Sequence, residues 1–322
     1  MPLAPLIPRI KPPALQPGDT IGIIAPASNI KRELLDAGCK ALRRLGYEPV
    51  YFDSILEKNL YFAGTNERRA RELEEMFSRD DVRAIVCARG GYGANYLLDS
   101  LNLEKIKAHP KIFVGYSDVT TLMTYILDTA GLVTFHGPMV TKDFVHSDGV
   151  DVASWEAALT GASRWSLDLG AESGVKPLRA GSAEGILYGG CLSMLAASLG
   201  TPYEIHSAGT ILFIEDVAAK PYQIDRMLMQ LKLAGKFAGV RGIIFGEMLD
   251  CLQNQDQGYS LEEIVLRVIG DLGLPVAYGL RSGHVSRQNV TLPFGVSAAL
   301  NVGEKEVSCR ILESATTPAA GS

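Results

Sequence analysis

The sequence is poor in cysteine and has neither a long apolar run nor a cluster of basic residues. Its five cysteines are scattered and none belongs to a C-x-x-C pair, which excludes a disulfide scaffold and a zinc-ribbon pattern. No apolar run approaches the roughly 20 residues that a membrane span needs, and the proline-rich opening lacks the basic head of a secretory signal. The net charge of -5 argues against a nucleic-acid partner. We therefore expect a cytoplasmic protein with neither a nucleic-acid nor a membrane partner.

The sequence does contain a regular alternation of strand-like and helix-like segments. In its first half, apolar runs typical of buried strands alternate with amphipathic or charged helical patterns. Such alternation predicts a parallel sheet with helices on both faces, the doubly wound α/β class. The strands are expected at 20–26, 47–52, 82–88, 112–114 and 131–138, and the helices at 30–46, 66–79 and 119–127.

The alternation stops in a stretch rich in Gly, Ser and Ala, which we interpret as a linker into a second domain. The second half mixes helices at 191–200, 221–235 and 260–273 with strands at 210–216, 239–248, 274–280, 290–295, 297–302 and 306–313. The predicted division is an extended arm at 1–16, an N-terminal α/β domain at 17–145, the linker at 146–180, a C-terminal domain at 181–314 and a disordered tail at 315–322.

A serine stands on an abrupt strand-to-helix turn. Only Gly115, Tyr116, Ser117 and Asp118 separate the strand at 112–114 from the helical pattern that follows. Ligands of a parallel sheet bind outside the carboxyl ends of the strands, where the helix N-terminus offers N–H groups to a developing oxyanion. This is the geometry of a nucleophile elbow, although the sequence lacks G-x-S-x-G. Alternatively, the serine only caps the helix, a role that serine favours.

A serine nucleophile needs a base, and five histidines are available. His284 lies in a glycine-bounded loop directly after a strand-like segment, and the glycine beside it allows close approach to another group. His136 ends a strand, where a hydrogen-bonded structural role is equally consistent. His109 and His146 lie in polar loops and His206 in a segment that we expect to be exposed.

The base in turn needs an acceptor that orients it. Glu215 and Asp216 end the apolar run at 210–214, where an unpaired carboxylate is unfavourable. The alternative is that these carboxylates cap the next helix, which begins near Pro221.

The glycine-rich stretch at 89–93 is a weak dinucleotide motif. The pattern G-x-G-x-x-G starting at Gly91 requires a third glycine where Tyr96 stands, and the stretch follows the third strand and not the first. Gly90 and Gly91 are better explained by a close approach of the backbone, with a free N–H donated into the adjacent site.

Eight segments, in order and covering nearly the whole chain, resemble the LD-carboxypeptidase family of serine peptidases, whose relatives include microcin-immunity hydrolases. They are GDTIGIIAPAS at 18–28, RGGYG at 89–93, GYSD at 115–118, GLVTFHGPM at 131–139, GG at 189–190, IED at 214–216, PYQIDRML at 221–228 and SGHVSRQNVTLPFG at 282–295. Each motif is weak alone, whereas eight in series are specific.

The resemblance implies a catalytic triad of Ser117, Glu215 and His284, with an oxyanion hole made by the backbone N–H groups of Gly91 and Asp118. It implies no metal and no cofactor. The implied substrate is a murein tetrapeptide, cut between a diamino acid and a terminal D-alanine during peptidoglycan recycling. The implied fold pairs a flavodoxin-like N-terminal domain with a smaller, strand-rich C-terminal domain, usually as a homodimer.

Two departures from the family pattern bear on the substrate. Cys191 stands where relatives often carry Asn, and Ala219 and Lys220 stand where they often carry Glu. One alternative is therefore an amidase that detoxifies a peptide–nucleotide antibiotic, which would use an aromatic side chain such as Trp155 or Trp165 to stack a base. A non-catalytic ligand-binding module and a nicotinamide or flavin enzyme are further alternatives, and neither explains the contexts of the predicted triad.

Overall fold

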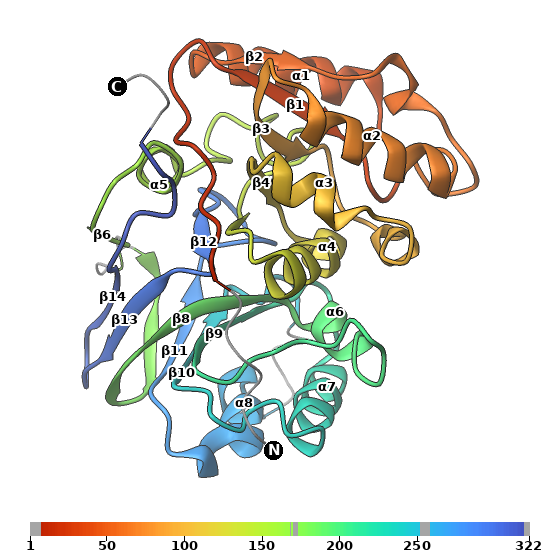
Figure 1. Cartoon of the computed structure of the whole chain (residues 1–322). Coiled ribbons are helices and arrows are strands. Elements are labelled where there is room, and N and C mark those ends of the chain that lie inside the picture. Colours follow the sequence, from red (N-terminus) through yellow and green to blue (C-terminus); the bar gives the residue numbers. More distant parts are fainter. Residues whose placement is uncertain (1–7, 168, 170–172, 252–257, 319–322) are drawn as a thin grey trace.

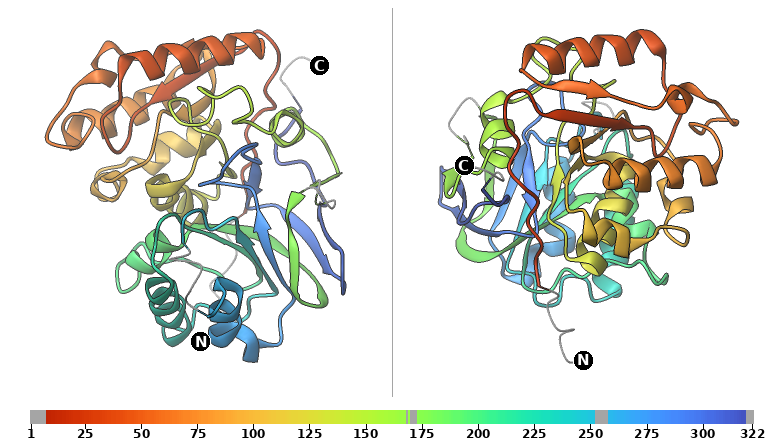
Figure 2. Two further views of the ribbon diagram at one scale, coloured as in Figure 1. Left: turned by 180° about the vertical axis from the view of Figure 1, so that it is seen from behind. Right: turned by 45° about the horizontal axis from the view of Figure 1, so that its top comes forward.

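The structure, a computed structural model, describes residues 8–167, 169, 173–251 and 258–318. Its strands form one six-stranded and one eight-stranded sheet, which Figures 1 and 2 show in separate halves of the molecule. Among the described residues, no helix is long and apolar enough to cross a membrane. The predicted α/β class with a parallel sheet and a strand-rich second part is confirmed.

The first sheet has the flavodoxin-like strand order. Its order is β2-β1-β3-β4-β5-β12, in which the first five strands are parallel and β12 pairs antiparallel with β5. The order 2-1-3-4-5 is the doubly wound arrangement of flavodoxin. The strands are β1 (Thr20–Ile24), β2 (Glu48–Val50), β3 (Val82–Cys87), β4 (Ile112–Gly115), β5 (Thr134–His136) and β12 (Leu292–Phe294).

Four helices follow the strands of this sheet: α1 (Arg32–Arg44), α2 (Asn66–Ser78), α3 (Leu103–Ala108) and α4 (Thr120–Tyr125). In α1, Leu35, Cys39 and Leu42 recur at helical spacing, and all three are buried. The helix α2 is rich in charge and exposes one face to solvent, but Arg69 on its other face is only 1% exposed.

The second sheet has the order β6-β14-β13-β8-β9-β10-β11-β7, with parallel pairing from β8 to β11. The strands are β6 (Trp165–Ser166), β7 (Lys176–Arg179), β8 (Gly181–Cys191), β9 (Thr210–Glu215), β10 (Gly242–Gly246), β11 (Val276–Leu280), β13 (Ser297–Val302) and β14 (Val307–Ile311). The helices of this half are α6 (Leu192–Ala197), α7 (Pro221–Leu233) and α8 (Leu261–Ile269).

The central strand β8 is absent from the sequence prediction. Its four glycines read as a loop, because glycine weakens a strand interior. Two of them, Gly185 and Gly189, allow the close approach of the neighbouring β9 segment. A Cβ at Gly189 would lie 1.9 Å from the carbonyl oxygen of Phe213, and one at Gly185 would lie 2.7 Å from that of Gly209.

Three predicted boundaries differ from the structure. The expected linker contains α5 (Val152–Leu159) as well as β6 and β7. In the expected tail, Ala315 and Thr316 are buried and Thr317 donates its backbone N–H to the carbonyl of Pro12 over 2.9 Å, so the prediction of disorder is wrong for 315–317. Residues 319–322 lie outside the described residues.

The third difference concerns β12, which the sequence assigns to the C-terminal domain. The structure pairs it with β5 in the first sheet, Leu292 opposite His136. The chain therefore returns to the first sheet directly after the loop that carries His284, and this return fixes the loop between the two halves (Figure 1).

Candidate active site

Ser117 lies on a strained turn at the carboxyl end of β4. Its φ is 63°, in the left-handed region that non-glycine residues rarely occupy and that costs about 1–3 kcal/mol. The turn needs a glycine before it, because a Cβ at Gly115 would lie 2.7 Å from the side chain of Val119. The 3-10 helix η3 (Ser117–Val119) has Tyr116 as its N-cap, without a side-chain capping bond. The capping alternative for Ser117 is therefore wrong.

Gly90 packs directly against Ser117. A Cβ at Gly90 would lie 2.8 Å from the serine Cβ, 3.0 Å from its Oγ and 3.2 Å from the backbone N of Asp118. The carboxylate of Asp118 accepts the backbone N–H of Ala94 over 2.7 Å, which ties the turn of Ser117 to the glycine-rich loop. The close backbone approach expected at Gly90 is confirmed.

Arg69 is a supporting residue that the sequence analysis missed. Its buried guanidinium donates to the carbonyl of Pro26 after β1 over 2.6 Å and to that of Gly93 after β3 over 2.8 Å. It lies 4.9 Å from the centre of the Phe62 ring. The loops after β1 and β3, where the strand order reverses, are thus held together. No sequence signal separates Arg69 from an ordinary surface arginine.

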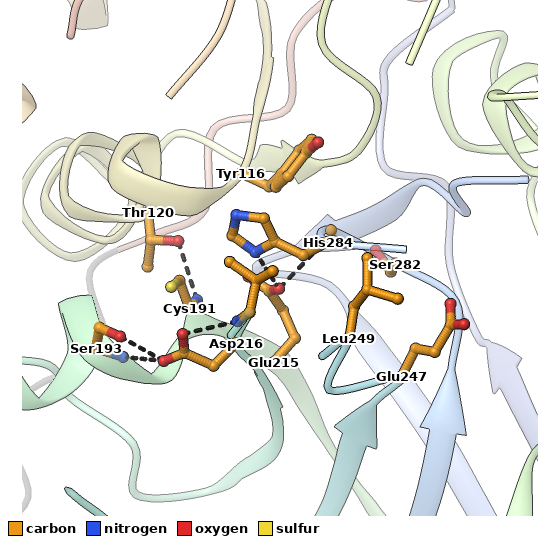
Figure 3. Close-up of polar contacts among 12 residues, drawn as sticks. Tyr116, Thr120, Cys191, Ser193, Glu215, Asp216, Glu247, Leu249, Ser282 and His284 are labelled. Carbon is orange, nitrogen blue, oxygen red and sulfur yellow. Dashed lines mark hydrogen bonds and ion pairs between the residues drawn. The ribbon is translucent and has the colours of Figure 1, made fainter. Parts of the chain in front are cut away.

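Glu215 and His284 form the central polar pair. Glu215 ends β9 and is fully buried, and its Oε2 accepts from Nδ1 of His284 over 2.7 Å and from the backbone N–H of His284 over 3.1 Å. Figure 3 shows the imidazole between Glu215 and the ring of Tyr116. The Tyr116 ring meets it edge-on, with 5.1 Å between the ring centres.

The charges of this pair stabilise each other. Burial opposes the ionised form of Glu215, but the charge and hydrogen bond of His284, together with the neighbouring His136, outweigh it and lower the pKa of Glu215 to about 2. Burial likewise opposes protonation of His284, and the charge of Glu215 outweighs it and raises the pKa of His284 above its usual 6.5. Glu215 is therefore an anion at neutral pH.

The turn that carries Ser117 meets this pair across the two sheets. Tyr116 precedes the serine and contacts His284. At the start of α4, which follows this turn, the hydroxyl of Thr120 accepts the backbone N–H of Cys191 over 3.1 Å, as Figure 3 shows. The structure thus brings the neighbourhoods of all three predicted triad residues into one place.

The remaining candidates have other partners. Asp216 accepts the backbone N–H of Ser193 over 2.8 Å together with its hydroxyl, so it holds the start of α6 (Figure 3). His206 lies 3.3 Å from Asp128, away from the pair. His136 lies beside Glu215, 3.8 Å from its Oε1.

A metal site was not expected, yet the described residues contain one group with the necessary proximity. The ligand atoms of Cys191, Glu215 and His284 lie within 4.8 Å of one another. Its chemistry fits a proton-transfer pair better than a metal. The carboxylate and imidazole already share a hydrogen bond, and burial together with Glu215 and Asp216 raises the pKa of the Cys191 thiol well above its usual value.

A pocket of about 450 Å³, a size typical of small-molecule sites, opens beside Asp118, the residue that follows Ser117. Both halves of the chain line it. Its residues include Tyr92, Asp118 and Thr121 from the first half, and Met194 and Tyr203 from the second.

Comparison with known proteins gives concordant matches. The family profile of the LD-carboxypeptidase N-terminal domain matches residues 21–137, and that of the LD-carboxypeptidase C-terminal domain matches residues 184–300. The chain is 41% identical over 303 residues to a probable murein peptide carboxypeptidase of Bacillus subtilis, covering 92% of each chain. It is 32% identical to the murein tetrapeptide carboxypeptidase of Pseudomonas aeruginosa, covering 87% of this chain and 92% of the relative.

Solved structures agree. The muramoyltetrapeptide carboxypeptidase of Oxalobacter formigenes superposes with a TM-score of 0.81 at 30% identity, covering 92% of this chain and all of that one. The microcin C7 self-immunity protein MccF in its wild-type apo state gives a TM-score of 0.87 at 28% identity, covering 96% of this chain and all of that one.

The pKa values predict the pH dependence of a reaction in which neutral His284 takes a proton from Ser117. We expect kcat/KM to fall as the pH drops through a midpoint above 6.5, because the raised pKa of His284 belongs to the base. Replacing Glu215 by Gln removes the largest charge that raises this pKa, so the imidazole of that variant should titrate at a lower pH than in the wild type in an NMR titration. An acid limb set near pH 4 or below would show that a carboxylate is the titrating base.

Proposed function

Because the chain belongs to the LD-carboxypeptidase family of serine peptidases, we propose that it hydrolyses the amide bond between a diamino acid and the terminal D-alanine of a murein tetrapeptide. The observation that carries the proposal is the hydrogen-bonded pair of buried Glu215 and His284 beside the strained turn of Ser117. Strain of this kind persists where the surrounding structure imposes it, and it is concentrated at functional sites.

The proposed mechanism assigns one role to each triad residue. Nδ1 of His284 is occupied by Glu215, so Nε2 is the nitrogen that takes the hydroxyl proton of Ser117. The serine oxygen attacks the amide carbonyl, and His284 then delivers the proton to the nitrogen of the leaving D-alanine. Water, activated by the same imidazole, clears the acyl-enzyme. Glu215 holds the tautomer and stabilises the imidazolium.

The backbone N–H groups of Gly91 and Asp118 are the proposed oxyanion donors. Support comes from Gly90, the residue before Gly91, which packs against the side chain of Ser117 and the amide nitrogen of Asp118. Each such donor stabilises the transition state by about 3 kcal/mol. No step of this mechanism requires a metal or an organic cofactor.

One observation favours a peptide over a nucleotide conjugate as substrate: of the two tryptophans considered for stacking a base, Trp165 is half-buried and Trp155 is excluded. Trp155 is 1% exposed and packs edge-on against Phe144, so it is not available to stack a base. The pocket of about 450 Å³ beside Asp118 has a size typical of small-molecule sites, and it is the proposed binding place for the end of the peptide. The likeness to MccF supports the amidase alternative. Cys191, which stands where relatives often carry Asn, lies beside Glu215 and His284.

We also propose that the protein acts in the cytoplasm, on peptides returned from the cell wall. The five cysteines are all buried and free, with no disulfide among them, as is usual in a reducing compartment.

The substrate proposal is tested by offering purified protein two compounds in parallel. One is a murein tetrapeptide with terminal D-alanine and the other is an aminoacyl nucleotide amide. We expect release of free D-alanine with kcat/KM at least tenfold above that for the nucleotide conjugate, and no loss of activity in EDTA. A preference for the conjugate would establish the amidase alternative, and loss in EDTA restored by zinc would overturn the serine mechanism.

We further propose that the chain forms a homodimer through α7. Tyr222, Met229 and Leu233 lie on one face of this helix and are 55%, 37% and 82% exposed. Asp225 and Arg226 line the same surface, so a two-fold arrangement lets each copy place an arginine opposite the partner's aspartate. A second copy therefore suits both the apolar and the charged groups of this face.

Light scattering after size exclusion tests the dimer. We expect the wild-type protein at twice the mass of the chain and Leu233→Glu at the monomer mass, because the charge would be buried in the interface. Leu60→Glu is the matched control, since Leu60 is 80% exposed but belongs to the first half. A wild-type monomer, or a Leu233→Glu dimer, would reject this interface.

A further inference from the structure

His136 lies on the far side of the Glu215 carboxylate from His284. It ends β5 and is fully buried, with Nε2 3.8 Å from Oε1 of Glu215 and Nδ1 2.8 Å from the hydroxyl of Ser282. Among the described residues, neither Nε2 of His136 nor Oε1 of Glu215 has a hydrogen-bond partner. An ionised carboxylate oxygen without a donor is costly in a dry interior. The two unpartnered atoms face each other.

The hydroxyl of Ser282 decides which imidazole nitrogen carries the proton. It has one proton and two neighbouring acceptors, Nδ1 of His136 at 2.8 Å and the carbonyl oxygen of Val290 at 2.7 Å. If the proton points to Val290, the neutral imidazole holds its own proton on Nδ1, and the Nε2 lone pair opposes the carboxylate. If it points to Nδ1, the imidazole carries Nε2–H toward Oε1.

The second arrangement is the favourable one. It leaves the carbonyl oxygen of Val290 without the Ser282 proton, which costs less free energy than leaving an ionised carboxylate oxygen without a donor. We propose that His136 is a positioning residue of the active site, which donates Nε2–H to Oε1 of Glu215 in a tautomer set by the hydroxyl of Ser282. This inference rests on the proposed role of Glu215 in the triad.

The surroundings of His136 favour its neutral form, in which only one of the two ring nitrogens carries a proton. Phe213 and Phe294 flank the ring with centre-to-centre distances of 5.1 and 5.4 Å, and the charged groups that act on it are Glu215 and His284. Burial lowers the pKa of His136 and outweighs the opposing effect of Glu215. A neutral imidazole donates from one nitrogen alone.

Gly283 closes the space around the pair. With a φ of 90°, it passes so near that a Cβ there would lie 2.7 Å from Cδ of Glu215 and 2.8 Å from Cε1 of His136. The remaining gap of 3.8 Å is longer than an N–H···O bond. Catalytic hydrogen bonds are often long without substrate and shorten in the reacting complex. The inferred donor fixes Oε1 and thereby holds Oε2 against His284.

Two amide substitutions separate the two ring nitrogens. The side-chain amide of His136→Gln reaches the position of Nε2 and keeps a donor toward Glu215, whereas that of His136→Asn reaches only the position of Nδ1. For release of D-alanine we expect kcat of the Gln variant within about tenfold of wild type and kcat of the Asn variant lower by about a hundredfold, the range for groups that orient a functional side chain. KM should stay unchanged in both, because His136 does not touch the substrate.

Equal losses in the two variants, or a change confined to KM, would overturn the inference. A second measurement is independent of activity and of the folding of any variant. Nitrogen-15 NMR of the wild-type imidazole should show a protonated Nε2 and an unprotonated Nδ1, and a protonated Nδ1 would contradict the assignment of the tautomer. If the protein instead releases no D-alanine but shows this tautomer, the proposed function fails while the inferred contact stands.

Discussion

The hydrogen bond of 2.7 Å between Glu215 and His284 is the interaction on which the rest of the site depends. A carboxylate at the end of a fully buried strand is tolerable only with a partner, and its partner arrives from a loop nearly 70 positions later in the chain. The pair fixes the imidazole, lowers one pKa and raises the other. The contacts that hold the 282–290 loop in place therefore also fix the position of the His284 imidazole.

Contacts with both sheets fix the position of the 282–290 loop. The strand β12 follows the loop and pairs with β5, so the loop is anchored in the first sheet while Glu215 belongs to the second. Gly190 lets β8 come so close to α4 that a Cβ there would lie 2.5 Å from the Thr120 side chain. Ser117 and Gly90 follow β4 and β3, next to the point between β1 and β3 where the strand order reverses, which is where flavodoxin-like sheets bind ligands.

The sequence carries the parts of this arrangement that depend on local pattern. The alternation of apolar runs and helical periods predicts the flavodoxin-like half, and the four residues between strand and helix predict the turn on which Ser117 takes its strained φ. The resemblance supplies the pairing of Glu215 with His284, which no spacing along the chain implies. The roles assigned to these residues remain predictions.

The parts that the sequence does not carry depend on contacts between distant segments. The sequence of β8 predicts a loop because it is rich in glycine. Glycines such as Gly189 are required there by the close approach of a neighbouring strand and not by a turn. The arginine Arg69 reads as a surface residue, although its partners are two carbonyls in other loops. Likewise, nothing near His136 in the sequence indicates the carboxylate beside it.

The central claim is that Ser117 carries the acyl group during turnover, and rapid-quench mass spectrometry tests it most directly. The protein would be mixed with a murein tripeptide ester of D-lactate, whose good leaving group favours accumulation of the acyl-enzyme. The account predicts a covalent adduct on the peptide that contains Ser117, absent from Ser117→Ala, together with a loss of turnover on the order of 10⁶ in that variant. An adduct on another residue, or a Ser117→Ala variant that keeps more than about a hundredth of the wild-type rate, would contradict it.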